Sequence, residues 1–516
     1  MNAQSKAVTE IIVVGGGSAG WITACHLAKK WVSNTGPYRV TLIESPSIPT
    51  IGVGEGTVPM MRETLKYFGI REDEFIRTCD VTFKQSVKFI DWNRPDSGDY
   101  YHHLFDYPAF KGMLPAWLSQ PSASRTAFSS LVSVQGQLAD AGFGPRTMTN
   151  PQFMGQMHYA YHLDAGKFTQ MLADVATNKL GVTHKLAEVT EVKTDASGKI
   201  VGLVTDQGEL NADLYVDCSG FAARLIGQAC QVPFVDKSDI LFVDNAMVAQ
   251  VPYPQSDTPI PCFTKSTAKE AGWIWDIGLT QRRGVGYVYS SRYSSDEQAE
   301  QVLRDYLSHD LASSADGVKF RKVPMKVGYR DHSWHQNCVA IGLASGFVEP
   351  LEATGLLIFD VTARMLAESL PANQAVMPLV AERYNQRVQH AWNKVIDFIK
   401  LHYVLAKRDD TAFWRDNRDE ASIPASLQQS LALWQYHPPS AYDFASTLEV
   451  FNLENYLYVL YGSEFDTQLS TAADKADEMI AARERLISQQ IASLKPHLLP
   501  HRQLLERIYQ FGIQLN

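Results

Sequence analysis

The stretch VTFKQSVKFIDW, residues 81–92, carries two lysines whose amines could do chemistry. Apolar and polar residues alternate there, which predicts a half-buried strand. Lys84 and Lys88 are four residues apart, so on a regular strand their side chains would lie on the same face. A lysine in this setting is either a solvated residue, the commoner case for a lysine taken alone, or a reactive amine held in a pocket.

A carboxylate and the start of a helix come together in GFVEPLEATG, residues 346–355. Pro350 fixes the shape of this loop, and a helix is predicted to begin near Thr354. The free backbone N–H groups of Thr354 and Gly355 would form an anion site small enough for a halide. Glu352 precedes them and is either a partner of the helix dipole or a catalytic acid or base.

A glycine-rich turn follows the first predicted strand. That strand, residues 10–14, is an apolar run typical of burial on both faces. GGGSAG at 15–20 and an apolar helical stretch come next, so the GxGxxG pattern has its strand, turn and helix in order. The following predicted strand ends at Glu44, 24 residues after Gly20, which is near the spacing of a carboxylate that binds an adenosine ribose. The sequence therefore predicts a dinucleotide site.

Aromatic residues occur in two further stretches. Trp273 and Trp275 lie on a predicted strand in GWIWDIG, and because they are two residues apart they point to the same face. They would form a flat wall of two indoles, or simply pack in the core. The chain is predicted to be helical from residue 376 onward, and there Tyr456 is a candidate wall of an aromatic site.

Other elements must position these residues. Residues 51–59 are rich in glycine and proline, which predicts a shaped loop that lies against the cofactor or is an ordinary surface loop. Residues 93–156 have weak periodicity and are predicted to be an irregular insertion. Asp164 is a candidate N-cap of an amphipathic helix, a hairpin pattern leads to Asp217, and residues 236–330 predict a largely antiparallel sheet.

Composition limits the class of protein. The chain has 516 residues, of which 45% are hydrophobic and 20% charged, so a sizeable core is expected. A net charge of −9 argues against a nucleic-acid or anionic-membrane surface, and no apolar run has the length of a membrane span. The six cysteines are scattered without a CxxC, so no disulfide framework or metal site is predicted, and a cytoplasmic location fits best.

Five stretches occur in the order found in flavin-dependent halogenases of the tryptophan-halogenase type, and the chain resembles that family over nearly its whole length. They are GGGSAGW, IGVGEGTVP, TFKQSVKFIDW, GWIWDIGL and FVEPLEATG. The lysine strand and the W-x-W pattern are specific to the family, whereas the dinucleotide motif is not. The resemblance implies an α/β fold: a Rossmann-like, FAD-binding, flavoprotein monooxygenase-type fold with a sheet insertion and a helical C-terminal substrate region.

The resemblance also implies how the chain is divided. A discontinuous FAD-binding domain is expected to comprise residues 1–92, 157–235 and 325–372. The substrate-binding region is expected to comprise residues 93–156, 236–324 and 373–516.

The family's functional residues can be carried over by position. Lys84 corresponds to the reactive lysine and Glu352 to the essential glutamate, while Thr354 and Gly355 correspond to the backbone halide site. The FAD site would comprise the phosphate loop, the ribose contact, the strap at 51–57 and two leucines against the flavin: Gly15, Gly17, Ser18, Ala19, Gly20, Glu44, Gly54, Glu55, Gly56, Leu343 and Leu356. The substrate pocket would include Trp273, Trp275 and Tyr456.

The chemistry implied by the resemblance joins two distant sites. Reduced FAD (FADH2) and O2 give a flavin hydroperoxide, and chloride or bromide attacks it to give hypohalous acid, which passes through the protein to Lys84. Lys84 holds it by a hydrogen bond or as a haloamine and presents it to an indole or other electron-rich aromatic, with free tryptophan as the alternative substrate. Glu352 stabilises the developing cation or removes its proton. A separate NAD(P)H-dependent flavin reductase is the expected partner, and a homodimer is left open.

Two positions depart from the family pattern. Gly278 replaces the proline of W-x-W-x-I-P, which frees the backbone, so a difference is expected in the shape of the pocket more than in its chemistry. Ala353 replaces the serine that usually follows the glutamate, so one hydrogen bond that could position the lysine is missing.

Two rival functions would use the same kind of cofactor domain. A flavin-dependent aromatic hydroxylase would need its substrate beside the flavin and typically has Gly-Asp after the last cofactor strand, where this chain has Gly342 and Leu343. A non-catalytic flavoprotein would not need both Lys84 and Glu352. Halide-dependent product formation separates all three.

Overall fold

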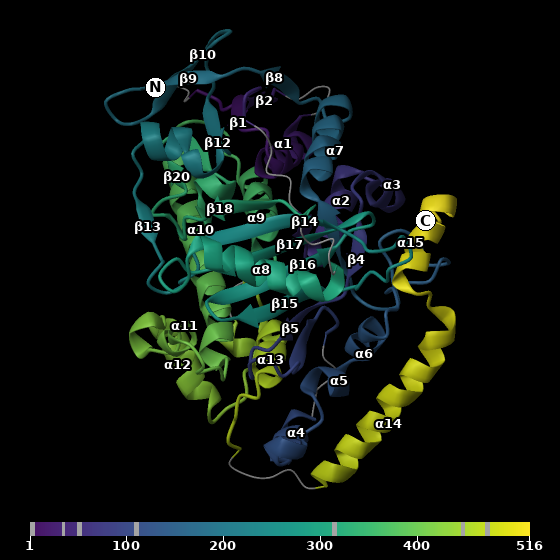
Figure 1. Cartoon of the computed structure of the whole chain (residues 1–516). Coiled ribbons are helices and arrows are strands. Elements are labelled where there is room, and N and C mark those ends of the chain that lie inside the picture. Colours follow the sequence, from purple (N-terminus) through teal and green to yellow (C-terminus); the bar gives the residue numbers. More distant parts are fainter. Residues whose placement is uncertain are drawn as a thin grey trace.

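The computed structural model of the chain describes residues 6–32, 37–48, 54–107, 113–311, 317–444, 449–469 and 475–515. Figure 1 shows the N-terminal part at one end of the molecule and a large sheet across its middle. Helices of the C-terminal third lie at the other end and along one side. Among the helices of the described residues, none is long and apolar enough to cross a membrane.

A six-stranded sheet forms the dinucleotide-binding part, in the order β20-β21-β12-β1-β2-β8. All neighbours in it pair in parallel except β20 and β21. Its strands are β1 (Glu10–Val14), β2 (Arg39–Glu44), β8 (Thr183–Leu186), β12 (Leu214–Asp217), β20 (Trp334–His335) and β21 (Cys338–Ala340). The sheet confirms the predicted Rossmann-like part of the fold.

Both faces of this sheet are covered. Ile11 and Val13 of β1 pack in the core with helices α1 (Ser18–Trp31), α7 (Ala165–Asn178) and α9 (Thr354–Glu368). Ile12 and Val14 pack instead with the antiparallel sheet of β9 (Val189–Thr194), β10 (Ile200–Thr205) and β11 (Gly208–Leu210). Burial on both faces explains the apolar run of β1. The predicted N-cap of α7 is confirmed, because the Asp164 carboxylate accepts a hydrogen bond from the Lys167 N–H at 3.1 Å.

A seven-stranded sheet crosses the middle of the molecule, in the order β18-β14-β17-β16-β15-β5-β6. Its strands are β18 (Phe320–Pro324), β14 (Asn245–Pro252), β17 (Arg282–Tyr289), β16 (Gly272–Gly278), β15 (Thr264–Lys269), β5 (Ser86–Ile90) and β6 (Tyr100–Leu104). Every pair is antiparallel except β15 and β5. The largely antiparallel sheet predicted for residues 236–330 is therefore confirmed, and β5 and β6 extend it.

The lysine stretch is not the single half-buried strand that the alternation predicts. Residues Thr82–Lys84 form β4 in a small sheet of order β3-β7-β4, with β3 (Gly54–Gly56) and β7 (Ala160–Asp164). The chain leaves this sheet at Gln85, whose N–H donates to the Cys262 carbonyl, and then enters β5 of the large sheet. Thr82, Gln85 and Ser86 are buried together with their apolar neighbours, because this segment is enclosed on both faces.

The switch between sheets also separates the two lysines. The Nζ of Lys88 lies 2.7 Å from Asp140 and 3.5 Å from the centre of the Tyr100 ring. Lys84 belongs instead to the small sheet, where it pairs with Ala160 of β7. The prediction that both share one face is wrong, because it assumed a regular strand through Gln85.

The remaining helices before the C-terminal third are α2 (Met60–Phe68), α3 (Glu72–Thr78), α4 (Leu114–Ser119), α5 (Phe128–Val132), α6 (Gln135–Asp140) and α8 (Asp296–Leu311). The C-terminal third is helical as predicted, with α10 (Met377–Leu405), α11 (Ala412–Asp416), α12 (Ala425–Trp434), α13 (Leu453–Gly462), α14 (Ala476–Leu494) and α15 (His501–Phe511). Every residue from Val395 to Tyr403 is buried, so the end of α10 lies inside the protein and brings polar side chains to the interior.

Candidate active site

Lys84 ends β4 at the edge of the small sheet, and only 1% of its surface is exposed. Its Nζ donates a hydrogen bond to the carbonyl of Thr57 at 3.2 Å and lies 5.3 Å from the centre of the Phe105 ring. Gly56 leaves room for the amine, since a Cβ there would lie 3.2 Å from Nζ. The structure therefore favours the amine held in a pocket over the solvated lysine.

The surroundings of Lys84 favour its neutral form. Burial lowers the pKa of Lys84 to about 8, although the charge of Glu352 opposes this shift. His162, on the neighbouring strand β7, pairs through Nε2 with the Thr264 hydroxyl at 2.8 Å. Burial, with repulsion from Lys84, holds the pKa of His162 well below its usual value. A partly neutral buried amine can serve as a hydrogen-bond donor or as a nucleophile.

Glu352 is held between two imidazoles from different elements. Its Oε1 accepts hydrogen bonds from His103 Nδ1 on β6 and from His402 Nε2 on α10, each at 2.8 Å. Asn455 Nδ2 donates to the other nitrogen of His103 at 2.9 Å, and its Oδ1 accepts from the Asn452 N–H at 3.0 Å, which fixes the orientation of the amide. His103 therefore carries its proton on Nδ1, and this N–H donates a hydrogen bond to Glu352.

His402 faces two acceptors. Its Nδ1 lies 2.9 Å from the carbonyl of Phe398, while its Nε2 faces Glu352. Neither partner is a donor, and a protonated Nε2 donates a hydrogen bond to the Glu352 carboxylate. Burial alone would raise the pKa of Glu352, but the two histidines outweigh it and lower that pKa to about 2. Glu352 is thus a buried anion although Ala353 supplies no serine hydroxyl.

The predicted anion site lies at the start of α9. The helix begins at Thr354, after Ala353 in a left-handed conformation with φ of 55°, and its first turn contains no acidic residue. Thr354 is buried, and its hydroxyl has no partner among the described residues. A Cβ on Gly355 would meet no atom within 4 Å. Backbone donors, an unpartnered hydroxyl and open space together fit a small anion.

The phosphate loop has the geometry that a dinucleotide needs. Gly15 has φ of 122°, and a Cβ there would lie 2.2 Å from the Cys218 carbonyl oxygen, so this position requires glycine. A Cβ on Gly20 would clash with the Gly15 carbonyl at 1.9 Å. Gly17 is different, because a Cβ there would meet nothing within 4 Å, which leaves room beside the backbone. Helix α1 begins at Ser18 without a side-chain cap, so its first amides can bind a phosphate.

Glu44 lies beside this loop, as predicted for a ribose contact. A Cβ on Gly16 would be 2.1 Å from the Glu44 Cδ, and His184 Nε2 lies 2.9 Å from the Glu44 Oε2. On the opposite side, Gly342 packs against Ala19, where a Cβ on the glycine would lie 2.6 Å away. Leu343 follows Gly342 directly.

The predicted strap is described only from residue 54, and residues 51–53 lie outside the described residues. Gly54 packs against Gly284 of β17, since a Cβ on Gly284 would lie 3.2 Å from the Gly54 Cα. Glu55 is partly buried, and desolvation raises its pKa to about 7. Leu356 is buried in the first turn of α9.

The two tryptophans of β16 are neighbours, but they do not form the predicted flat wall. Their ring centres lie 6.3 Å apart and their planes are tilted by 57°. Each indole has its own anchor: Trp273 Nε1 donates to Glu349 Oε2 at 2.6 Å, while the ring of Trp275 occupies the space above Gly286. Trp275 also lines a groove of about 540 Å3 that includes Gly54 of the strap.

Tyr456 lies on α13 and belongs to an aromatic cluster that also includes residues of α10 and α12. Its ring lies 4.8 Å from that of Phe398 and 5.4 Å from that of Trp434. Phe398 in turn contacts His103 at 5.8 Å, so Tyr456 is one ring removed from the Glu352 site.

Sequence reasoning missed three residues of this site, namely His103, His402 and Glu349. His103 and His402 lie 249 and 50 positions from Glu352, and no local pattern connects them. Glu349 had a visible signal, since it lies in the same loop three residues before Glu352. Phe105 belongs to the predicted irregular insertion, and its ring lies beside the amine of Lys84.

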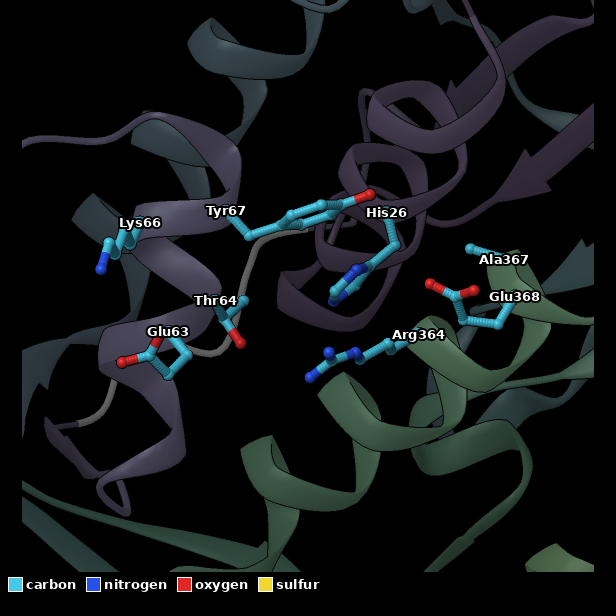
Figure 2. Close-up of a pocket in the computed structure, with 8 residues that line it drawn as sticks. All are labelled: His26, Glu63, Thr64, Lys66, Tyr67, Arg364, Ala367 and Glu368. Atoms are coloured by element: carbon cyan, nitrogen blue, oxygen red, sulfur yellow. The ribbon is translucent and has the colours of Figure 1, made fainter.

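A separate hollow of about 270 Å3 lies between α1, α2 and α9 and includes none of the predicted site residues (Figure 2). Figure 2 shows His26, Tyr67 and Arg364 around it. His26 pairs with Asp360 at 2.7 Å, and Thr64 donates to the other oxygen of Asp360, also at 2.7 Å. These bonds tie the three helices together, which explains the polar floor of the hollow.

Comparison with known proteins agrees with this geometry. A family model for tryptophan halogenases matches residues 10–478. The tryptophan 6-halogenase SttH of Streptomyces toxytricini is 36% identical over 501 residues, which cover 92% of this chain and 93% of that protein. The crystal structure of a tryptophan halogenase from Shewanella frigidimarina is 42% identical, with a TM-score of 0.93, and the match covers 98% of this chain and 99% of that one.

A third relative is a flavin-dependent halogenase from Xanthomonas campestris, Xcc4156. It is 31% identical, with a TM-score of 0.85 and a match over 99% of each chain. The matches extend over nearly the whole chain, and the dinucleotide loop and the buried lysine and glutamate agree with them. The chain therefore belongs to the tryptophan halogenase family of flavin-dependent enzymes.

Proposed function

We propose that this protein halogenates an indole or another electron-rich aromatic, using reduced FAD, O2 and chloride or bromide. The observation that carries the proposal is the buried pair of Lys84 and Glu352. The amine has a pKa lowered to about 8, and it lies within electrostatic reach of a carboxylate that two histidines keep ionised. Neither a hydroxylase nor a non-catalytic flavoprotein needs such a pair.

The chain's own residues would bind the cofactor and the halide. The open loop at Gly17 and the first amides of α1 would hold the pyrophosphate, and Glu44 would hold the ribose. Thr354 and Gly355 would bind the halide through their N–H groups. Bound reduced FAD, with O2, supplies the oxidation of the halide to hypohalous acid.

Hypohalous acid would then pass through the interior of the protein to the side where the substrate binds. Lys84, Glu352 and Thr354 are each no more than 2% exposed, so bulk water is largely excluded along this route. Exclusion of water protects a reactive oxidant from loss to solvent. In our proposal Lys84 holds the hypohalous acid by a hydrogen bond or as a haloamine.

Glu352 would act on the aromatic ring as it is attacked. A carboxylate kept ionised by His103 and His402 stabilises positive charge that develops on the ring. It can also accept the proton that the ring loses, because a protonated aromatic ring is a far stronger acid than a carboxylic acid.

The substrate preference rests on the polar groups of α13. The hydroxyl of Tyr458 donates to the Asp106 carbonyl, that of Tyr461 pairs with Thr467, and Asn455 binds His103. These groups are already committed and do not form a charged clamp for a free amino acid. We therefore propose a neutral indole or similar aromatic, with free tryptophan as the alternative.

The test is an assay of the purified protein with FAD, NADH and a separate flavin reductase, which is the partner we propose. Chloride or bromide and a panel containing indole and tryptophan are added, and products are identified by mass spectrometry. Halogenated product that depends on halide supports the proposal. Oxygenated product without halide dependence would identify a hydroxylase instead, and efficient turnover of tryptophan with none of indole would refute the substrate preference.

A further inference from the structure

A second buried carboxylate lies in the same loop as Glu352 and has no role in the proposed reaction. Glu349 is 1% exposed, and its Oε2 accepts two hydrogen bonds of 2.6 Å, one from Trp273 Nε1 and one from the Tyr403 hydroxyl. Its Oε1 has no partner among the described residues. Trp273 belongs to β16 of the large sheet and Tyr403 to α10, so one carboxylate connects three elements.

The two glutamates of the loop are bound by consecutive residues of the same helix. His402 binds Glu352 and Tyr403 binds Glu349. This part of α10 is buried on all sides, so it is held in place by close packing. The loop is therefore attached to a rigid support at two points, with Pro350 and Leu351 between them.

We infer that Glu349 is a positioning residue, which fixes the loop so that Glu352 and the amides of Thr354 and Gly355 keep their places. This inference rests on the proposed halogenation. Hydrogen bonds of this kind hold the groups that act on a reacting atom, and a displacement of about 1 Å at such a site can cost about a hundredfold in rate. Loss of Glu349 should therefore weaken halide use and let oxidant escape, although Glu349 touches neither halide nor substrate in the proposal.

Two substitutions separate hydrogen bonding from charge. Glu349→Ala removes both accepted hydrogen bonds. Glu349→Gln removes the charge but keeps a carbonyl oxygen that can accept from Trp273 and Tyr403. For each variant, the KM for bromide, the ratio of hydrogen peroxide to halogenated product, and the thermal midpoint with and without FAD are measured against the wild type.

We expect Glu349→Ala to raise the bromide KM and the peroxide-to-product ratio by about tenfold or more, whereas Glu349→Gln stays within about threefold of the wild type. Wild-type values in a folded Glu349→Ala variant would overturn the inference, and so would a loss in Glu349→Gln as large as in Glu349→Ala. Where Glu349→Ala does not fold, Tyr403→Phe removes a single hydroxyl and should raise the same ratio. No change in folded Tyr403→Phe would likewise count against a positioning role.

A measurement that does not require turnover distinguishes failure of this inference from failure of the proposed function. Crystals of wild type, Glu349→Ala and Glu349→Gln are soaked in bromide, and bound bromide is located by its anomalous scattering. Bromide at Thr354 and Gly355 should be present in the wild type and in Glu349→Gln and weaker in Glu349→Ala. If the wild type makes no halogenated product, the proposed function fails, while equal bromide occupancy in all three proteins would refute the role of Glu349.

Discussion

The amine of Lys84 donates a hydrogen bond to the carbonyl of Thr57, 3.2 Å away at the opposite edge of the small sheet β3-β7-β4. Thr57 directly follows the strap strand β3. The end of the strap and the lysine therefore belong to one rigid unit, with β7 between them.

Lys84→Ala should abolish halogenation while reduced flavin continues to react with oxygen, because in our proposal the two reactions take place at different sites. Hydrogen peroxide should appear at nearly the wild-type rate without halogenated product. Lys88→Ala is the matched control, since Lys88 lies on β5 of the large sheet, where its amine pairs with Asp140 and lies over the Tyr100 ring. Halogenated product from Lys84→Ala at the wild-type level would contradict the assignment.

Lys84→Met should stabilise the folded protein near pH 7. Burial lowers the pKa of Lys84 from 10.5 to about 8, so the buried ammonium destabilises the fold below pH 8, and this cost disappears as the pH rises from 8 to 10.5. The shift corresponds to roughly 3 kcal/mol. Chemical denaturation of both proteins at pH 7 and pH 10.5 measures it, and an equal difference in stability at the two pH values would contradict the prediction.

The pH dependence of halogenation distinguishes two roles of Lys84. If the neutral amine forms a haloamine, the rate should rise with pH through about 8, because the pKa of Lys84 is lowered to that value by burial. If the ammonium donates a hydrogen bond instead, the rate should fall over the same range. Initial rates of product formation between pH 6.5 and pH 9.5 decide between them, with peroxide formation as the control for the flavin reaction.

Gly355→Pro should weaken the use of halide. The substitution removes one N–H from the first turn of α9, where proline fits the helix. One hydrogen bond to a charged group contributes about 1.5–3 kcal/mol, so the halide KM should rise by about tenfold or more. Gly355→Ala also places a carbon in the open space but keeps the N–H, so the difference in halide KM between the two variants reports the lost donor. An unchanged KM in folded Gly355→Pro would exclude the amide as a halide donor.

Gly17→Val should abolish FAD binding without unfolding the protein. A Cβ at Gly17 meets no protein atom within 4 Å and its φ is −77°, so valine is tolerated by the chain but fills the space for the pyrophosphate. Fluorescence titration with FAD measures affinity, and the thermal midpoint of the FAD-free protein reports on folding. Wild-type affinity in this variant would show that the cofactor binds elsewhere.

Local patterns in the sequence were enough to predict some of these features. The dinucleotide loop was predicted because strand, glycine turn and helix are adjacent in the chain, and Glu44 ends the next strand beside it. The antiparallel sheet and the C-terminal helices follow from periodicity in the same way. Lys84 and Glu352 needed the family resemblance in addition, because a lysine on a strand and a glutamate in a loop are ambiguous alone.

Tertiary structure decided the environment of those residues. The alternation around Lys84 suggested a regular strand, but the chain changes sheets at Gln85, and this change separates Lys84 from Lys88. His103 and His402 reach Glu352 only because β6 and the buried end of α10 pack against the same loop. The pKa values of the amine and the carboxylate depend on burial and on charges brought together from distant parts of the chain, and for that physical reason no local pattern contains them.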